Sequence, residues 1–305
     1  MKRYVPSFLL LAALVASPLA GQASSPLDRI LDLDVDRVEV GRVDVVYSAH
    51  QDADSVTTAV AARAAAGPFA DAAGYFAQEL GGDLQVTLAL LSPRDWHRVR
   101  AGMHAIPWSW QPSRLVVLPV RSDLGLLQQG GQDSARAGRV LEVVGLHQLG
   151  HVVAAAYYHP YDYRAPHPPV RWFDELLASY LSHAYMRARR PGLAEFVEEL
   201  ALDVVMTAEP RFSSLSQYDR YYDGYLSSPS GATNLGWYQN AFNLQAVRLY
   251  DRYGPELMHR LRDELPWDRI EGWTTDELLD ALQEIAPGFA SWAEEMAAYT
   301  GAPRR

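Results

Sequence analysis

Apolar positions alternate with polar ones in the first third of the chain, a period of two that is typical of half-buried β-strands. Residues 38–48 follow this pattern, and two further apolar stretches, residues 84–91 and 114–120, are also predicted to be strands. The first has Gly41 near its start, which predicts one or two strands with a turn at that glycine. Pro119 lies near the end of the third stretch and predicts an edge or a strand end, because proline has no backbone N–H to donate.

Helical patterns separate these strands. The alanine-rich residues 54–80 predict a helix that is broken or kinked at Gly67-Pro68 and ended by Gly81-Gly82. Residues 95–100 predict a short helix. The resulting order of strand, helix, strand and strand predicts a small mixed sheet backed by a helix, over about residues 36–125.

From about residue 130 onward apolar residues recur at the spacing of helices. The predicted helices cover residues 139–156, 172–189, 193–207, 237–253, 255–264 and 287–299, and a capping box at Thr274 and Glu277 opens one more. Three stretches are predicted to be irregular: residues 128–138, 157–169 and 209–235. We therefore predict an α+β fold, in which a small mixed-sheet lobe precedes a mainly helical lobe at about 130–300, in one domain over residues 24–305.

The helix predicted over residues 139–156 carries a possible metal-binding pair, in the sequence His147-Gln148-Leu149-Gly150-His151. Residues four apart on a helix lie one turn apart on one face, so the two imidazole rings can converge on one ion. The surrounding positions are apolar, so the helix is expected to be buried, and buried imidazoles need partners. Two structural histidines are the alternative, because a chain with nine histidines can contain such a pair by chance.

A carboxylate on the next predicted helix completes a ligand set. Glu175 follows His151 by 24 residues, within a segment that has helical periodicity. Two histidines and one glutamate form one of the catalytic zinc sites that keep a fourth coordination position open. We therefore predict that His147, His151 and Glu175 bind Zn²⁺.

The two motifs together resemble a known family of zinc enzymes. HxxGH from His147 to His151, followed by WxxExxAxY from Trp172 to Tyr180, is similar to the HExGH and WxxEGxAxY signatures of the gluzincin metallopeptidases, in particular the peptidase MA-like group. The resemblance implies that His147 and His151 are the histidine ligands and Glu175 is the third ligand. The scaffold residues that it implies around this ligand are Trp172, Ala178 and Tyr180.

The resemblance extends over most of residues 36–299. The order of strands and helix before the zinc helix is the same in that family, and residues 237–254 are similar to its YAxAxxF…RYG segment. It implies a thermolysin-like architecture with the metal between the two lobes and a peptide or protein as the ligand in that cleft. A sheet edge near the metal holds the peptide in this family, and residues 114–120 are our candidate for strand addition.

Two residues depart from the family pattern. Leu176 stands where the family usually has glycine, which is a change of packing. Gln148 stands where the family has the catalytic glutamate, and an amide oxygen is not basic enough to accept a proton at neutral pH. Because positioned proton transfer contributes about a hundred- to ten-thousandfold in rate, we expect weakened or absent peptidase activity with an intact metal site.

The resemblance also suggests a residue that stabilises an oxyanion, and Tyr238 is the best match to that role. A tyrosine packed in the cleft wall is the alternative for Tyr238. With Gln148 in place of a carboxylate, zinc and Glu175 sum to a charge of +1, which predicts a preference for anionic ligands. His159 and His167, in the proline-rich connection between the ligand helices, are further candidate ligands, with solvated loop histidines as the alternative.

The N-terminal residues 1–23 have the pattern of a secretory signal peptide. Lys2 and Arg3 precede an apolar core at residues 8–15, and Gly21-Gln22-Ala23 is a cleavage site of small residues. The core is too short to span a bilayer, so we predict no stable membrane insertion. The mature chain is expected to begin near Ser24 and to be exported to the periplasm or the medium.

The composition narrows the range of partners. The chain has a formal charge of −10, and removal of Lys2 and Arg3 lowers it to −12, which argues against nucleic acid or an anionic membrane as partner. It contains no cysteine, so stability must come from the hydrophobic core and not from disulfides.

Three functions are compatible with these patterns. The first is a secreted zinc-binding relative of the gluzincins that has weakened or lost peptidase activity and binds a peptide or protein. The second is an active zinc metallohydrolase that uses a base other than the residue at position 148. The third is a structural or interaction domain whose histidines hold no metal.

Overall fold

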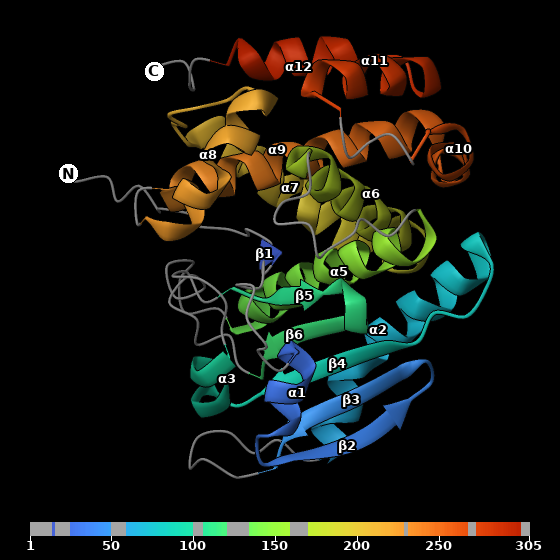
Figure 1. The fold of residues 1–305 in the computed structure, drawn as a ribbon, viewed down its shortest axis with the longest axis vertical. Coiled ribbons are helices and arrows are strands. Elements are labelled where there is room, and N and C mark those ends of the chain that lie inside the picture. The colour runs from blue at the N-terminus through green and yellow to red at the C-terminus, as the bar shows by residue number, and fades with distance from the viewer. Residues whose placement is uncertain are drawn as a thin grey trace.

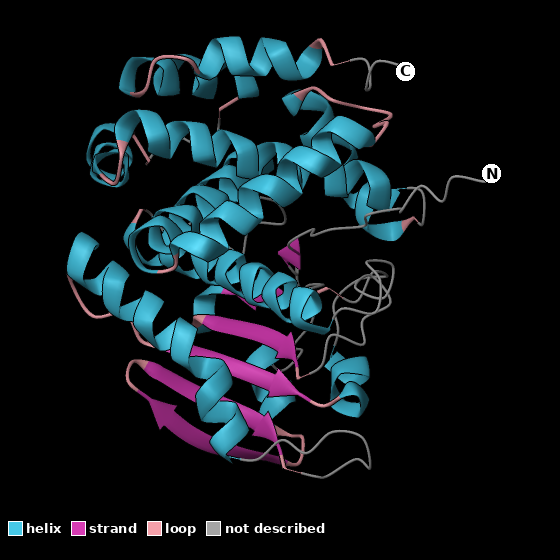
Figure 2. Ribbon diagram, turned by 180° about the vertical axis from the view of Figure 1, so that it is seen from behind, coloured by secondary structure: helices cyan, strands magenta, loops and turns pink. Residues whose placement is uncertain are grey.

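The computed structural model describes residues 14–15, 25–49, 59–99, 106–120, 134–158, 170–228, 231–267 and 273–299. A β-sheet with helix α2 on one face forms one side of the molecule, and a stack of helices forms the other (Figures 1 and 2). The α+β fold with a sheet region followed by a mainly helical region is therefore confirmed.

The sheet is mixed and has the strand order β1-β5-β6-β4-β3-β2. Its strands are β1 (Leu14–Val15), β2 (Val35–Val40), β3 (Val43–Ser48), β4 (Val86–Leu91), β5 (Trp108–Trp110) and β6 (Leu115–Pro119). β2 and β3 form the predicted antiparallel hairpin, and Gly41 makes its turn with a positive φ of 58°. β3, β4 and β6 are parallel neighbours, and β5 is antiparallel to β6.

The prediction that residues 114–120 form a sheet edge is wrong, whereas the alternative prediction, a strand end at Pro119, is confirmed. β6 pairs with β4 on one side and with β5 on the other, so its backbone is already used on both sides. Sequence periodicity missed β5, because three residues are too few to show an alternating pattern. Along Leu115–Val117, where β5 pairs with it, β6 therefore has no free edge to which a peptide could add.

Helix α2 (Ala59–Leu80) packs against β2 and β3, and it continues through Pro68 without the predicted break. Its buried face, which includes Phe69 and Phe76, is anchored on the sheet, and that burial outweighs the backbone hydrogen bond that proline cannot make. Gly81 and Gly82 end the helix with φ of 78° and 85°, as the sequence predicts.

The helical region follows the predicted order. Its members are α5 (Ser134–Tyr157), α6 (Arg171–Arg189), α7 (Pro191–Thr207), α8 (Leu215–Ser227), α9 (Gly231–Tyr253), α10 (Glu256–Glu264), α11 (Thr275–Ile285) and α12 (Phe289–Ala297). Helices α5, α6, α7 and α9 are longer than predicted, whereas α10 and α12 are shorter. The capping box of Thr274 and Glu277 opens α11 as predicted. α8 lies within residues predicted to be irregular, and a second capping box, formed by Ser214 and Gln217, opens it. Two short helices, α1 (Pro26–Leu31) and α3 (Pro93–Val99), lie in the sheet region.

Helix α5 joins the two regions, because it packs on β5 and β6 on one side and on α6 on the other. Among the described helices it is the one long and apolar enough to cross a membrane, yet 72% of its most apolar window is buried inside the protein. This burial is typical of a core helix. The two predicted histidine ligands therefore lie at the centre of the molecule, on the helix that both regions share.

Candidate metal centre

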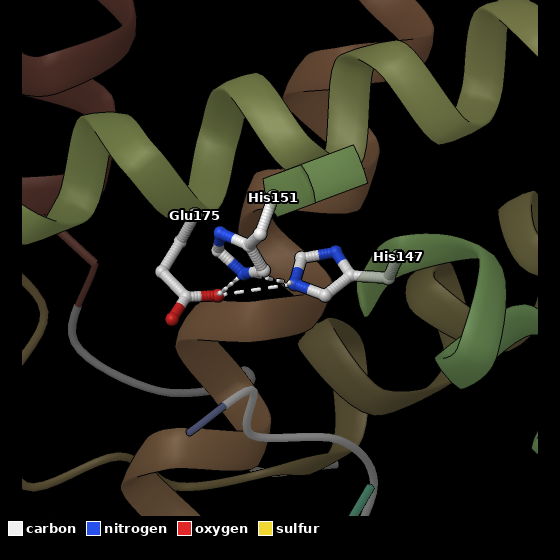
Figure 3. Close-up of side chains that lie close together, drawn as sticks. All are labelled: His147, His151 and Glu175. Carbon is white, nitrogen blue, oxygen red and sulfur yellow. Dashed lines mark hydrogen bonds and ion pairs between the residues drawn. The ribbon is translucent and has the colours of Figure 1, made fainter. Parts of the chain in front are cut away.

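The structure brings the three predicted ligands together. His147 and His151 of α5 and Glu175 of α6 each offer one donor atom, and these atoms lie within 4.8 Å of one another. His147 Nε2 is 3.1 Å from Glu175 Oε2 and 3.1 Å from His151 Nε2, and His151 Nε2 is 3.5 Å from Glu175 Oε2. Figure 3 shows the two rings and one carboxylate oxygen converging on a common point.

These separations fit a zinc ion. Donor atoms bound to a tetrahedral zinc at its usual bond lengths lie about 3.3 Å from one another. The three observed separations bracket that value, and all three side chains are almost completely buried. Two imidazole nitrogens that face each other at 3.1 Å cannot both be neutral acceptors without a shared proton or cation between them.

Asp174 lies beside the ring nitrogen of His151 that does not face the triad. His151 Nδ1 lies 3.1 Å from Asp174 Oδ2, which is within ion-pair distance, although Nδ1 has no hydrogen bond of regular geometry among the described residues, and His151 Nε2 lies 3.5 Å from Glu175 Oε2. Burial of His151 opposes its protonation, but the Asp174 and Glu175 carboxylates raise its pKa to about 10. A metal ion would compete with a proton for His151 Nε2, so metal binding would depend on pH.

Asp174 also corrects the charge balance expected from the sequence. The predicted excess of +1 counted only zinc and Glu175, whereas the buried Asp174 carboxylate in contact with His151 adds a second negative charge. A zinc ion with Glu175 and Asp174 would sum to zero. This sum removes the excess charge on which the expected preference for anionic ligands was based, and that preference stays a prediction.

His147 is oriented by two residues that the sequence did not indicate. Its Nδ1 lies 3.3 Å from Ser179 Oγ, one turn after Glu175 on α6, and 3.4 Å from Gln239 Nε2 on α9. Gln239 Nε2 also donates a hydrogen bond to Ser179 Oγ. Burial lowers the pKa of His147, which favours the neutral ring that a metal ion requires.

Glu175 remains ionised in this environment. Burial raises the pKa of its carboxyl, but His151 and His147 outweigh burial and lower it to about 2. The oxygen that does not face the histidines, Oε1, accepts a hydrogen bond from the Tyr222 hydroxyl of α8 at 3.4 Å. The sequence did not indicate this tyrosine, because residues 209–235 were predicted to be irregular.

Gln148 has no exposed surface, and neither its amide nitrogen nor its amide oxygen has a hydrogen-bond partner among the described residues. A buried amide without partners costs about 1–3 kcal/mol. Gln148 directly follows the ligand His147 on α5, and the placement of its amide beside the ion, which the family resemblance implies, stays a prediction.

Tyr238, the predicted oxyanion-stabilising residue, lies on α9 and is completely buried. Its hydroxyl donates to the carbonyl oxygen of Ser214 at 2.8 Å, and its ring packs against Tyr218. The neighbouring Gln239 is the α9 residue that contacts His147. The oxyanion role of Tyr238 stays a prediction.

The scaffold residues of the motif fix α6 in place. Trp172 donates its backbone N–H to Asp219 and its indole N–H to Thr275, and the Tyr180 hydroxyl donates to the Gly254 carbonyl at 2.6 Å. These bonds connect the start of the Glu175 segment to α8 and α11, and its end to the turn between α9 and α10. Leu176, where the related family usually has glycine, is buried in the core. His159 and His167 lie outside the described residues.

Two surface cavities are lined by other parts of the chain. One has a volume of about 260 Å³ between α2, the ends of β4 and β6, and α5, and the other has about 500 Å³ between α5 and α7. None of the three ligands lines either cavity.

Comparison with known proteins gives a structural likeness only. No family model and no curated protein matches the chain. Similar solved structures include an M1 zinc metallopeptidase from Deinococcus radiodurans, with a TM-score of 0.46 and 13% identity, covering 88% of this chain and 52% of that one. A mutant of that enzyme bound to a Tyr-Ser-Ala substrate has a TM-score of 0.42, with the same identity and coverage.

A two-domain M1 zinc metallopeptidase mutant bound to L-arginine has a TM-score of 0.40 and 13% identity, and the match covers 86% of this chain and 49% of that one. The chain thus spans about half the length of these structures.

Proposed function

We propose that this chain is an exported, zinc-binding, metallopeptidase-like protein that binds a peptide or protein at its metal centre. We further propose that its peptidase activity is weakened or lost, because Gln148 replaces the general base. The observation that carries the proposal is the convergence of His147, His151 and Glu175 at the spacing of zinc ligands.

The residues around this centre have different proposed roles. His147, His151 and Glu175 would hold the ion, while Asp174 and Ser179 orient the two rings. When bound, zinc supplies a Lewis acid that polarises a ligand carbonyl. Gln148 can donate to a carbonyl and accept from an amide N–H of a bound peptide, but it cannot take a proton from water. The site is therefore suited to binding an amide and poorly suited to hydrolysing it.

A metal-free structural domain is the second candidate, and one observation favours it. The side chains of the triad contact one another directly, so a protonated His151 could take the place of an ion as the partner of Glu175 and His147. Metal content separates the two functions.

The first experiment is a zinc titration. Purified protein treated with a chelator and back-titrated is expected to bind about one zinc per chain, measured by elemental analysis. The double variant His147→Ala, His151→Ala is expected to bind none at this centre. An unchanged stoichiometry in the double variant would show that these residues are not the ligands.

The second experiment restores the base. Gln148→Glu changes side-chain volume very little, and we expect it to raise cleavage of a peptide library at least about tenfold, with an acid limb set by the new carboxyl. Gln148→Glu combined with Glu175→Ala is the control that lacks a metal ligand. Equal cleavage by wild type and Gln148→Glu would mean that another residue is the base. Zinc binding without cleavage by either protein would support a binding role alone.

A further inference from the structure

The two carboxylate oxygens of Glu175 face different partners. Oε2 lies 3.1 Å from His147 Nε2 and 3.5 Å from His151 Nε2, whereas Oε1 points away from both rings (Figure 3). Oε1 is instead 3.4 Å from the hydroxyl of Tyr222, which donates a hydrogen bond to it. A carboxylate oxygen that already accepts a hydrogen bond is a weaker competitor for a metal ion.

Tyr222 itself is held in place from two sides. It is almost completely buried, the Arg171 guanidinium lies 4.4 Å from the centre of its ring, and the Tyr218 ring meets it edge-on at 5.4 Å. A buried ring with a cation on its face and an aromatic at its edge has little freedom to rotate. The hydroxyl is therefore aimed at Glu175 by packing as well as by its hydrogen bond.

Other residues of α8 form hydrogen bonds with the first turn of α6. Asp223 accepts a hydrogen bond from Arg171 at 2.9 Å, and Asp219 accepts the backbone N–H of Trp172 at 3.1 Å. Both donors lie within the turn that precedes Glu175, so α8 fixes the start of the ligand helix and, through Tyr222, the ligand side chain as well. Positioning of this kind makes a metal site more ordered than its ligands alone would.

We propose that Tyr222 is a positioning residue that holds Glu175 as a one-oxygen ligand and thereby keeps the fourth coordination position open for the protein's ligand. The inference rests on the zinc site of the proposed function. If the Tyr222 bond is removed, Oε1 is free to turn toward the ion and to occupy a position that a peptide carbonyl or a water would take.

The test compares Tyr222→Phe with Tyr218→Phe. The first variant removes the Tyr222 hydroxyl that donates to Glu175, and it keeps the aromatic ring over which Arg171 lies. The second removes a buried hydroxyl that has no partner among the described residues, one turn earlier on the same helix. Both variants keep an aromatic ring at its place, and their melting temperatures report whether they fold.

Zinc affinity and cobalt spectra provide the readouts. We expect Tyr222→Phe to bind zinc about 10- to 100-fold more weakly in a chelator competition, because the loss of a positioned Glu175 outweighs the gain of a second oxygen donor, and Tyr218→Phe to bind as wild type does. Cobalt(II) in the zinc position should absorb strongly in the visible range in wild type, as four-coordinate cobalt does. It should absorb more weakly in Tyr222→Phe, because a second carboxylate oxygen raises the coordination number.

X-ray absorption of the zinc-loaded wild type adds a readout that needs no variant. Four light donors at about 2.0–2.1 Å are expected, with one oxygen from Glu175. Coordination by both Glu175 oxygens in wild type, or identical affinity and cobalt spectra in wild type and Tyr222→Phe, would overturn the inference and leave the zinc site standing. A wild-type protein that takes up no metal would overturn the proposed function, and the inference with it.

Discussion

Gly150 of α5 lies directly against Ala178 of α6. A β-carbon on Gly150 would come within 2.4 Å of the Ala178 carbonyl oxygen and within 2.9 Å of its Cα, distances that no real side chain adopts. Only glycine lets the two helix backbones approach so closely. His151 follows Gly150 and Glu175 precedes Ala178 by three residues, so this contact brings the two ligand helices within reach of one ion.

Gly150→Ala should therefore damage both the fold and the metal site. Overpacking of a tight contact costs about 1–3 kcal/mol, and separation of the helices moves both histidines away from Glu175. We expect a lower midpoint of urea unfolding together with weaker zinc binding. Gly138→Ala on the same helix is the control, because a β-carbon at that position would meet no heavy atom within 4 Å and alanine favours helix by up to about 1 kcal/mol. Equal stability of the two variants would contradict the close-packing argument.

Asp174→Asn should weaken zinc binding without unfolding the protein. The amide keeps the size of the side chain but loses the charge that stabilises the His151 Nδ1–H, and loss of such a partner typically costs 10- to 100-fold in metal affinity. Isothermal titration with zinc measures the effect. Asp251→Asn, which removes a surface carboxylate paired with Arg187, should leave zinc affinity unchanged. Unaltered affinity in Asp174→Asn would rule out its role in orienting His151.

His183 should make the free energy of unfolding depend on pH. It is buried, its ring nitrogens have no hydrogen-bond partner in the described part of the chain, and its ring lies edge-on to Tyr250 at 5.7 Å. Burial, together with Arg187, lowers its pKa from 6.5 to about 4. A lowered pKa means that the unfolded chain takes up the proton first. This contribution to stability is therefore complete above pH 6.5 and is lost as the pH falls toward 4.

His183→Phe keeps an aromatic ring and removes the titration. Urea unfolding from pH 7 to pH 4 should show a smaller loss of stability in this variant, by up to about 3 kcal/mol. His97→Gln, at an exposed position of α3, should retain the wild-type dependence. Parallel pH profiles for wild type and His183→Phe would show that His183 is not the group responsible.

Export predicts a defined N-terminus. Intact mass of protein recovered from the periplasm or the medium should correspond to a chain that begins near Ser24. Ala23→Trp places a large residue at the predicted cleavage site and should leave the precursor uncleaved. The structure pairs Leu14 and Val15 with Trp108 and Ser109 of β5, so cleavage would also remove strand β1 from the sheet. A full-length species in the cytoplasm would reject this prediction.

The sequence alone determined most of the helices and the histidine pair, because both depend on local geometry. Residues four apart must share a helix face, so His147 and His151 had to lie together wherever α5 packed. The WxxExxAxY segment placed Glu175 on the following helix, and its resemblance to a known motif linked the two helices. Capping boxes, such as that of Thr274 and Glu277, are equally local.

Only the tertiary structure decided which residues surround the triad and how the sheet is ordered. Strand order depends on hydrogen bonds between distant segments, so the sequence could not place β6 in the interior between β4 and β5. Asp174 and His151 lie on different helices, so no spacing in the sequence indicates their contact. Tyr222 contacts Glu175 only because α8 packs against α6. Contacts between residues far apart in sequence come from the packing of whole elements, and no local pattern records them.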